Sequence, residues 1–234
     1  MRVVKILFAS LFLAGTALGQ VKDVPPPPKP ADNGPSLQVT MKFIQDKMNE
    51  QGDVGYVLTL NNNSDFHVRV VYAMSDVAAD STTCALHVNE KRKLEMDPGG
   101  RTGENSQSST VPLKDIVSIT VESEQDAMNR AAADSAHPEN VTTCTPVTYD
   151  LTLKAAKKDA FAVHTVSSSA SKAKKHHVKD ESANEPVPGT EKVDDKSVQE
   201  KRFIFRDEET ADRVAKAITH AVELCGGGSA PEPF

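Results

Sequence analysis

The feature that most limits how this chain can fold is an apolar residue at every second position, repeated in short segments between residues 54 and 206. Successive side chains of a strand point to opposite faces of a sheet, so this period is typical of strands with one buried face. Turn-rich pieces separate the segments. We therefore expect a small antiparallel β-barrel or sandwich. The predicted strands are VGYVLTL (54–60), FHVRVVYA (66–73), TCALHV (83–88), DIVSITVES (115–123), VTYDLTL (147–153), FAVHTV (161–166) and RFIFR (202–206), with KRKLEM (91–96) as a further candidate.

Two other segments have the character of helices. SLQVTMKFIQDKMNEQG begins at Ser36, a good N-terminal cap, and ends at Gly52, which fits the left-handed position just past a helix. EQDAMNRAAAD (124–134) has helical composition and predicts a short helix over the barrel. The apolar residues of the first helix recur at steps of three or four and form one face, made of Leu37, Met41, Ile44 and Met48.

The C-terminal segment FIFRDEETADRVAKAITHAVELCGGG (203–228) is a strand that runs into a third helix. Asp207 can cap this helix, acidic residues in its first turn suit the helix dipole, and Gly226 ends it. A barrel of short strands leaves one open end, and we expect the helix to close it. The predicted fold class is therefore α+β, a small barrel or sandwich with an N-terminal helix and a C-terminal capping helix. The apolar stripe of the third helix comprises Val214, Ala217, Ile218, Ala221, Val222, Leu224 and Cys225.

Changes of composition divide the chain. Residues 1–19 have the basic start, apolar run and small final residues of a cleaved secretory signal, which predicts a periplasmic or secreted protein with no transmembrane segment after cleavage. Residues 20–35 contain four consecutive prolines and predict a stiff linker. A single domain is expected over 36–226. Within it, the polar residues 167–200 predict a disordered insert, and residues 227–234 predict a flexible tail.

The net charge excludes one class of partner. The chain carries a formal charge of −6, and removal of the signal takes away Arg2 and Lys5, which leaves −8. An acidic chain without a basic patch interleaved with aromatic residues is not expected to bind nucleic acid.

The three cysteines predict one disulfide in an exported chain. Cys84 shares a strand face with apolar residues and Cys225 lies on the apolar helix stripe, so both side chains are expected to point into the core. Cys144 is followed by Thr-Pro, which favours an irregular backbone. The favoured pair is therefore Cys84–Cys225, with Cys144 free, and the alternative pair is Cys84–Cys144. The spacings contain no C-x-x-C, so no zinc or redox motif is expected.

Strands followed by one C-terminal helix are the plan of pleckstrin-homology-like barrels, and the chain resembles that superfamily over residues 53–226. The resemblance rests on LKDIVSITV, VTYDLTL, FAVHTV and the final strand and helix. Lipid-binding members carry a Lys/Arg cluster between their first two strands, where this chain has NNNSD (61–65), so the resemblance does not imply phosphoinositide binding. The segments PSLQVTMKFIQDKMNEQG and DEETADRVAKAITHAVELCGGG also resemble a group of uncharacterised exported bacterial proteins, which implies no activity.

We predict no catalytic, cofactor-binding or metal-binding residues. The sequence contains no G-x-S-x-G, no H-E-x-x-H and no glycine-rich phosphate loop. DPGGRTG (97–103) is interpreted as a flexible hairpin. His176 and His177 stand among lysines that repel a cation. The carboxylates of Asp207 and Glu208 are explained by capping of the helix.

These observations favour a non-enzymatic binding or structural module of the cell envelope. We expect it to recognise a protein or peptide at an open sheet edge or in a groove beside the final helix. The alternative is a small envelope hydrolase whose active site is built from scattered residues. A deep pocket with two convergent ionisable groups of shifted pKa would favour the hydrolase, whereas a shallow surface with an exposed apolar groove would favour the binding module.

Overall fold

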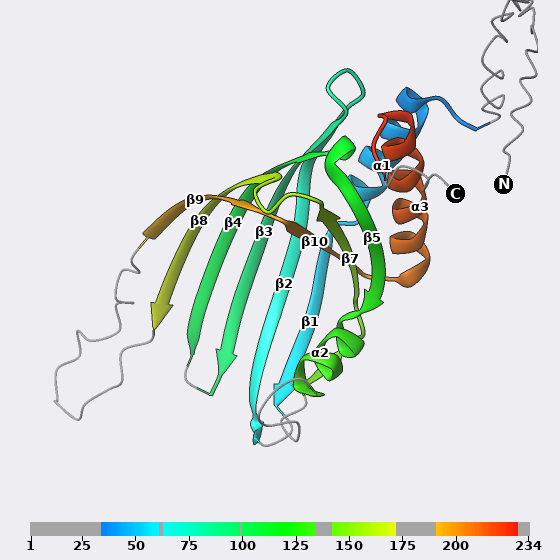
Figure 1. Ribbon diagram of the computed structural model, residues 1–234. Helices are drawn as coiled ribbons and strands as arrows, with labels where there is room; N and C mark the ends of the chain where they lie inside the picture. Colours follow the sequence, from blue (N-terminus) through cyan, green and yellow to red (C-terminus); the bar gives the residue numbers. More distant parts are fainter. Residues whose placement is uncertain (1–33, 61–62, 99, 134–141, 172–190, 229–234) are drawn as a thin grey trace, which may run out of the picture. The chain divides into compact units, whose positions relative to one another are not determined.

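The computed structural model describes residues 34–60, 63–98, 100–133, 142–171 and 191–228 (Figure 1). The predicted signal, residues 1–19, and nearly all of the predicted linker lie outside the described residues. The described strands form two antiparallel sheets, accompanied by three α-helices. The predicted α+β class with antiparallel sheets is therefore confirmed.

The larger sheet has seven strands in the order β6-β1-β2-β3-β4-β8-β9. The consecutive strands β1 to β4 pair with one another as hairpins. After longer connections, β6 pairs with β1 and β8 pairs with β4. The bounds are β1 (Asp53–Leu60), β2 (Asn63–Asp80), β3 (Ala85–Asp97), β4 (Arg101–Pro112), β6 (Thr142–Thr145), β8 (Phe161–Ser171) and β9 (Glu191–Val198).

The smaller sheet has three strands in the order β10-β7-β5, of which β7 and β10 follow the two edge strands of the larger sheet along the chain. Residues 146–148 connect β6 to β7, and Gln199 alone connects β9 to β10, so both edge strands of the large sheet continue into the small sheet. In Figure 1 the path from β9 to β10 crosses in front of the large sheet. The bounds are β5 (Ile116–Ser123), β7 (Tyr149–Ala155) and β10 (Glu200–Phe205).

The helices begin and end at the residues that the sequence indicates. In α1 (Leu37–Glu50) the Ser36 side chain accepts a hydrogen bond from the Val39 amide, and Gly52 has a φ of +63°. In α3 (Glu208–Leu224) the Asp207 side chain accepts from the Thr210 amide at 2.8 Å, and Gly226 has a φ of +73°. A positive φ costs glycine little, so both glycines end their helices without strain.

One hydrophobic core joins the two sheets and two helices. The apolar face of α1 packs on β2 and on α3, while α3 also packs on β5, β7 and the 3₁₀ turn η1 (Leu113–Asp115). The short helix α2 (Glu124–Ala133) lies against β6 and β5 instead. The largest fully buried side chains are Tyr56, Phe161, Phe203, Phe205, Met41, Ile44, Met48, Leu86, Leu113, Ile116, Leu151 and Leu153.

The described strands do not close into a barrel, which changes the role of α3. Because the chain leaves the large sheet at both edges, it forms a second layer instead of completing a ring. The helix therefore does not plug an open barrel end. It is sandwiched between the small sheet and α1, which explains why its apolar stripe is so wide.

Three strands, β4, β6 and β9, are absent from the sequence prediction because most of their side chains are polar. Residues 101–112, expected to be largely turn, form β4, which pairs with β3 on one side and β8 on the other. The predicted hairpin is correct in place, since Gly100 turns the chain with a φ of +56°, but it is much shorter than expected. Backbone hydrogen bonds to the strands on both sides order β4. Such bonds do not require an apolar residue at every second position, so the sequence gives no sign of them.

The predicted disordered insert, residues 167–200, forms strands at both of its ends. Residues 167–171 complete β8, and 191–198 form β9. The pairing of β8 with β9 runs from Phe161 opposite Val198 to Ser168 opposite Glu191. Nearly all of β9 is exposed, so burial of apolar side chains does not hold it in place. Its backbone hydrogen bonds to β8 do so instead. Residues 172–190 lie outside the described residues.

The structure contains the disulfide that the sequence favours, between Cys84 and Cys225, with a Cα–Cα distance of 5.9 Å. The reason given for Cys84 is wrong in one respect, because the residue lies in the turn before β3 with a φ of +54° and not within the strand. Cys225 is the C-terminal cap of α3. The bond therefore joins a turn to a helix end at the margin of the core, where both cysteines are only partly buried.

Candidate functional site

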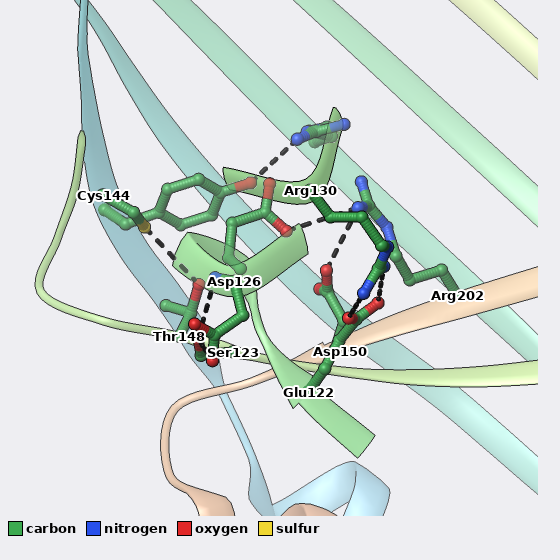
Figure 2. Close-up of polar contacts among 11 residues, drawn as sticks. Glu122, Ser123, Asp126, Arg130, Cys144, Thr148, Asp150 and Arg202 are labelled. Carbon is green, nitrogen blue, oxygen red and sulfur yellow. Dashed lines mark hydrogen bonds and ion pairs between the residues drawn. The ribbon is translucent and has the colours of Figure 1, made fainter. Parts of the chain in front are cut away.

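Three polar side chains meet where the small sheet lies over the large one (Figure 2). The Arg202 guanidinium on β10 lies 3.1 Å from Asp150 Oδ2 on β7 and 3.3 Å from Glu124 Oε2, the first residue of α2. Asp150 is fully buried and Glu124 is 5 % exposed, whereas the Arg202 side chain is 42 % exposed. The cluster therefore holds two carboxyl groups inside the protein and leaves only the arginine in contact with solvent.

The surroundings of Asp150 favour its protonated form. Burial, together with the neighbouring Glu124 and Glu122, raises the pKa of Asp150 to about 8, and Arg202 only partly opposes this shift. Asp150 Oδ1 is buried without a hydrogen-bond partner among the described residues. A protonated Asp150 resolves this, because its O–H can donate to Glu124. At neutral pH Asp150 thus keeps its proton, and Arg202 forms its ion pair with Glu124.

The start of α2 places Glu124 in the cluster. Ser123 precedes the helix, and its hydroxyl accepts from the Asp126 amide at 3.0 Å while donating to the Asp126 carboxylate at 2.6 Å. This reciprocal cap fixes the first turn. Gln125 ties the same turn to β6, since its side chain accepts from the Cys144 amide at 2.9 Å.

Arg130 and Glu122 form a second ion pair beside the cluster. The Arg130 guanidinium contacts both oxygens of Glu122, at 2.6 and 2.7 Å, and this pairing lowers the pKa of Glu122. The pair, Arg202 and the exposed side chains of the small sheet line a hollow of about 570 Å³ next to α2. Neither Asp150 nor Glu124 lines this hollow.

A second polar group lies deeper between the sheets. The Tyr72 hydroxyl on β2 donates to Glu90 Oε1 at 2.7 Å, and the Lys201 ammonium on β10 forms an ion pair with the same carboxylate. Lys201 also donates to Gln107 on β4. Burial, followed by the adjacent Glu90, raises the pKa of Tyr72 well above its usual value, so its hydroxyl stays protonated. Lys201 and Glu90 are each less than a tenth exposed and satisfy each other's charge.

The opposite face of the large sheet is not covered by any described helix or strand. Two adjoining hollows lie on it, of about 520 Å³ over β2, β3, β4 and β8, and of about 430 Å³ over β6, β1, β2 and β3. Both hollows include Arg69 and Glu95, which form an ion pair at 3.5 Å. Ala170, which lies opposite Thr102 in the strand register, places no large side chain over the first hollow. We refer to this combined surface as the open face.

The residues singled out from the sequence do not meet in one site. Cys84 and Cys225 form the disulfide, Asp207 caps α3, and His176 and His177 lie outside the described residues. The free Cys144 is buried on β6, where burial raises the pKa of its thiol. The expected groove beside the final helix is occupied by α1, which packs along it.

Sequence reasoning missed the cluster of Asp150, Glu124 and Arg202. In YDLTL, Asp150 alternates with buried leucines and reads as a solvent-facing residue. It is buried because residues distant in the sequence cover that face of β7, including Glu124 on α2 and Arg202 on β10. The one available signal was Glu124 at the start of a predicted helix, and capping explained it equally well.

Comparison with known proteins finds no match to a family model, to a curated protein or to a solved structure. Among the described residues, no group of three or more His, Cys, Asp or Glu side chains has the geometry to hold a metal ion. No helix in the described part of the chain has the length and apolarity needed to cross a membrane.

Proposed function

We propose that this protein is an exported, non-enzymatic binding module of the cell envelope whose open face takes a segment of a polypeptide partner. The observation that carries the proposal is a broad sheet face, uncovered within the described residues, on which two hollows join at Arg69 and Glu95. The disulfide is consistent with the oxidising compartment that export requires. The resemblance to pleckstrin-homology-like interaction modules remains a prediction and supports the binding class by analogy alone.

The charges of the open face favour a polypeptide over other partners. Cationic Arg69 and Lys93 alternate with anionic Glu95, Glu104 and Asp97 across the hollows. In the Arg69–Glu95 pair the side chains are 69 % and 54 % exposed, so the pair is solvated and contributes little to stability. Such pairs can exchange for the charges of a partner at small cost. A surface of mixed sign suits a segment that carries both lysine and carboxylate side chains.

The open face is a better site than the edge of the large sheet. The edge strand β9 presents a row of exposed charges, including Lys192, Asp194 and Lys196. Charged edge strands resist the addition of a further strand. The partner is therefore expected to lie across the strands of the open face and not to extend the sheet.

The alternative, an envelope hydrolase, receives less support from the same geometry. Asp150 and Glu124 are two convergent carboxyl groups, and the pKa of Asp150 is shifted, as an acid catalyst would require. Asp150, however, is fully buried, and neither residue lines one of the hollows described above. A general acid must come within hydrogen-bond reach of its substrate, and these groups are covered.

Site-specific photo-crosslinking tests the proposal. A photoreactive residue at Lys93 on the open face should give a discrete covalent adduct with one envelope protein in living cells. The matched control is the same residue at Lys216, which is exposed on α3 away from the open face. The double charge reversal Arg69→Glu with Glu95→Lys preserves the pair but reverses its direction, and it should weaken the adduct.

The partner would then be purified and its binding measured directly. Equal adducts from Lys93 and Lys216, or an adduct that is insensitive to the charge reversal, would contradict the docking face. Turnover of a generic ester or peptide substrate by the purified protein, lost on substitution of Arg202 by Gln, would favour the hydrolase.

A further inference from the structure

We infer that the small hollow between Arg92 and Arg202 is a binding site for a small oxyanion, such as a carboxylate or a phosphate group. The hollow has a volume of about 150 Å³ and lies between the inner face of the large sheet and β10. It is separate from the open face and does not depend on the function proposed above. Its lining residues are Tyr72, Glu90, Arg92, Asn105, Gln107, Arg202 and Ile204.

Arg92 uses only part of its hydrogen-bonding capacity within the described residues. Its guanidinium donates from Nη2 to the Tyr56 hydroxyl at 2.8 Å, and its Nε is buried without a hydrogen-bond partner among the described residues. It forms no ion pair with a carboxylate in the described part of the chain. A guanidinium has five N–H donors in a planar fork that matches the two oxygens of a carboxylate or phosphate. Apart from the bond to Tyr56, Arg92 therefore presents donors and a charge that no described residue satisfies.

The charged groups around the hollow do not balance, because one positive charge has no counterion. Glu90 is engaged by Lys201 and by the Tyr72 hydroxyl, so these three groups balance. Arg202 forms an ion pair with Glu124, and Asp150, which keeps its proton below about pH 8, adds no charge there. Only the charge of Arg92 remains. A partly buried cation without a counterion is costly, and one bound monoanion would remove the imbalance.

The other walls of the hollow suit a ligand of that size and polarity. Asn105 on β4 stands directly opposite Arg92 in the strand register, and its amide makes no hydrogen bond to another described residue. The amide can donate to a second oxygen of the anion. Ile204 supplies an apolar wall. Pockets for drug-sized ligands measure about 300–1,000 Å³, so this hollow fits only a small ligand or the terminal group of a larger one.

Binding of acetate and of inorganic phosphate to the purified full chain tests the inference. Calorimetric titrations and thermal unfolding would be run at about pH 7 with each salt, against sodium chloride at matched ionic strength. Acetate or phosphate should raise the unfolding midpoint above that in chloride, because a ligand that binds the folded state stabilises it. Acetate binding alone would identify a carboxylate site, and phosphate binding alone a phosphate site. No binding of either anion would overturn the inference.

Three variants assign the binding to this hollow. Arg92→Gln should lower the affinity at least tenfold, and Asn105→Leu, which keeps Arg92, should lower it by a smaller factor. Arg69→Gln, on the open face, is the matched control and should bind as the wild type does. Should Arg92→Gln fail to fold, Arg92→Lys keeps the positive charge but loses the planar fork and should still bind more weakly. Unchanged affinity in the folded Arg92 variants would refute the assignment.

Discussion

Replacement of Asp150 by asparagine should remove a large part of the pH dependence of folding. In the unfolded chain Asp150 ionises near its ordinary pKa of about 3.9, whereas in the folded protein it keeps its proton up to about pH 8. Between these limits the folded state binds the extra proton. The contribution of Asp150 to stability is therefore complete below about pH 3.9 and is lost progressively as the pH rises toward about 8.

The size of the effect follows from linkage. One proton bound only by the folded state lowers the free energy of unfolding by about 1.4 kcal/mol for each pH unit, or up to about 3 kcal/mol between about pH 5 and about pH 7. Asparagine does not titrate, has nearly the shape of the protonated acid, and can donate its amide N–H to Glu124 as that acid does. The variant should match the wild type near pH 4, where Asp150 is protonated in both states, and should be the more stable protein near pH 8.

Urea denaturation at a series of pH values measures this difference. The difference in unfolding free energy between the two proteins should widen steadily as the pH rises. Asp46→Asn is the matched control, because Asp46 is an aspartate on the surface of α1 whose side chain is 42 % exposed. Parallel pH profiles for the wild type and Asp150→Asn would refute the raised pKa of Asp150. A carboxyl-carbon NMR titration of the wild type gives an independent measurement, and a transition near pH 4 for Asp150 would also contradict it.

Two further predictions concern stability. Cys225→Ser opens a covalent loop with a sequence separation of 141 residues, and it should lower the unfolding free energy by about 3–5 kcal/mol on the chain-entropy estimate. Wild type in excess reductant should unfold at the same urea concentration as the variant, and a wild type insensitive to reductant would contradict this prediction. Asp207→Ala removes the acceptor for the Thr210 amide at 2.8 Å and should cost about 1 kcal/mol. Thermal unfolding would show this loss, with exposed Lys216→Ala as a control that changes stability much less.

The sequence predicted best those elements whose signals are local. Ser36, Gly52, Asp207 and Gly226 each act on a helix end within a few residues, and the structure places all four where the patterns indicate. Strands with one apolar face were also found. The strands β4, β6 and β9 were missed because backbone pairing, and not an apolar period, orders them.

The arrangement of the strands and the buried cluster depend on contacts between distant residues. Arg202 reaches across 52 positions to Asp150 and 78 positions to Glu124. No local pattern indicates which polar residue of an alternating strand will be covered by a second layer. The passage of the chain from β6 and β9 into the second sheet is equally hard to predict. A strand that ends and a strand that continues into another sheet have the same alternation of apolar and polar residues.

The exposed strand β9 also bears on how the protein behaves at high concentration. A second copy could in principle pair with this edge in the antiparallel sense, and repeated pairing of this kind leads to aggregates. In a symmetric pairing centred on Asp194, that residue would lie opposite its own copy, and Lys192 would lie opposite Lys196. Like charges directly opposite each other destabilise a strand pair. In this register the charge order of β9 therefore opposes pairing of the edge with a second copy.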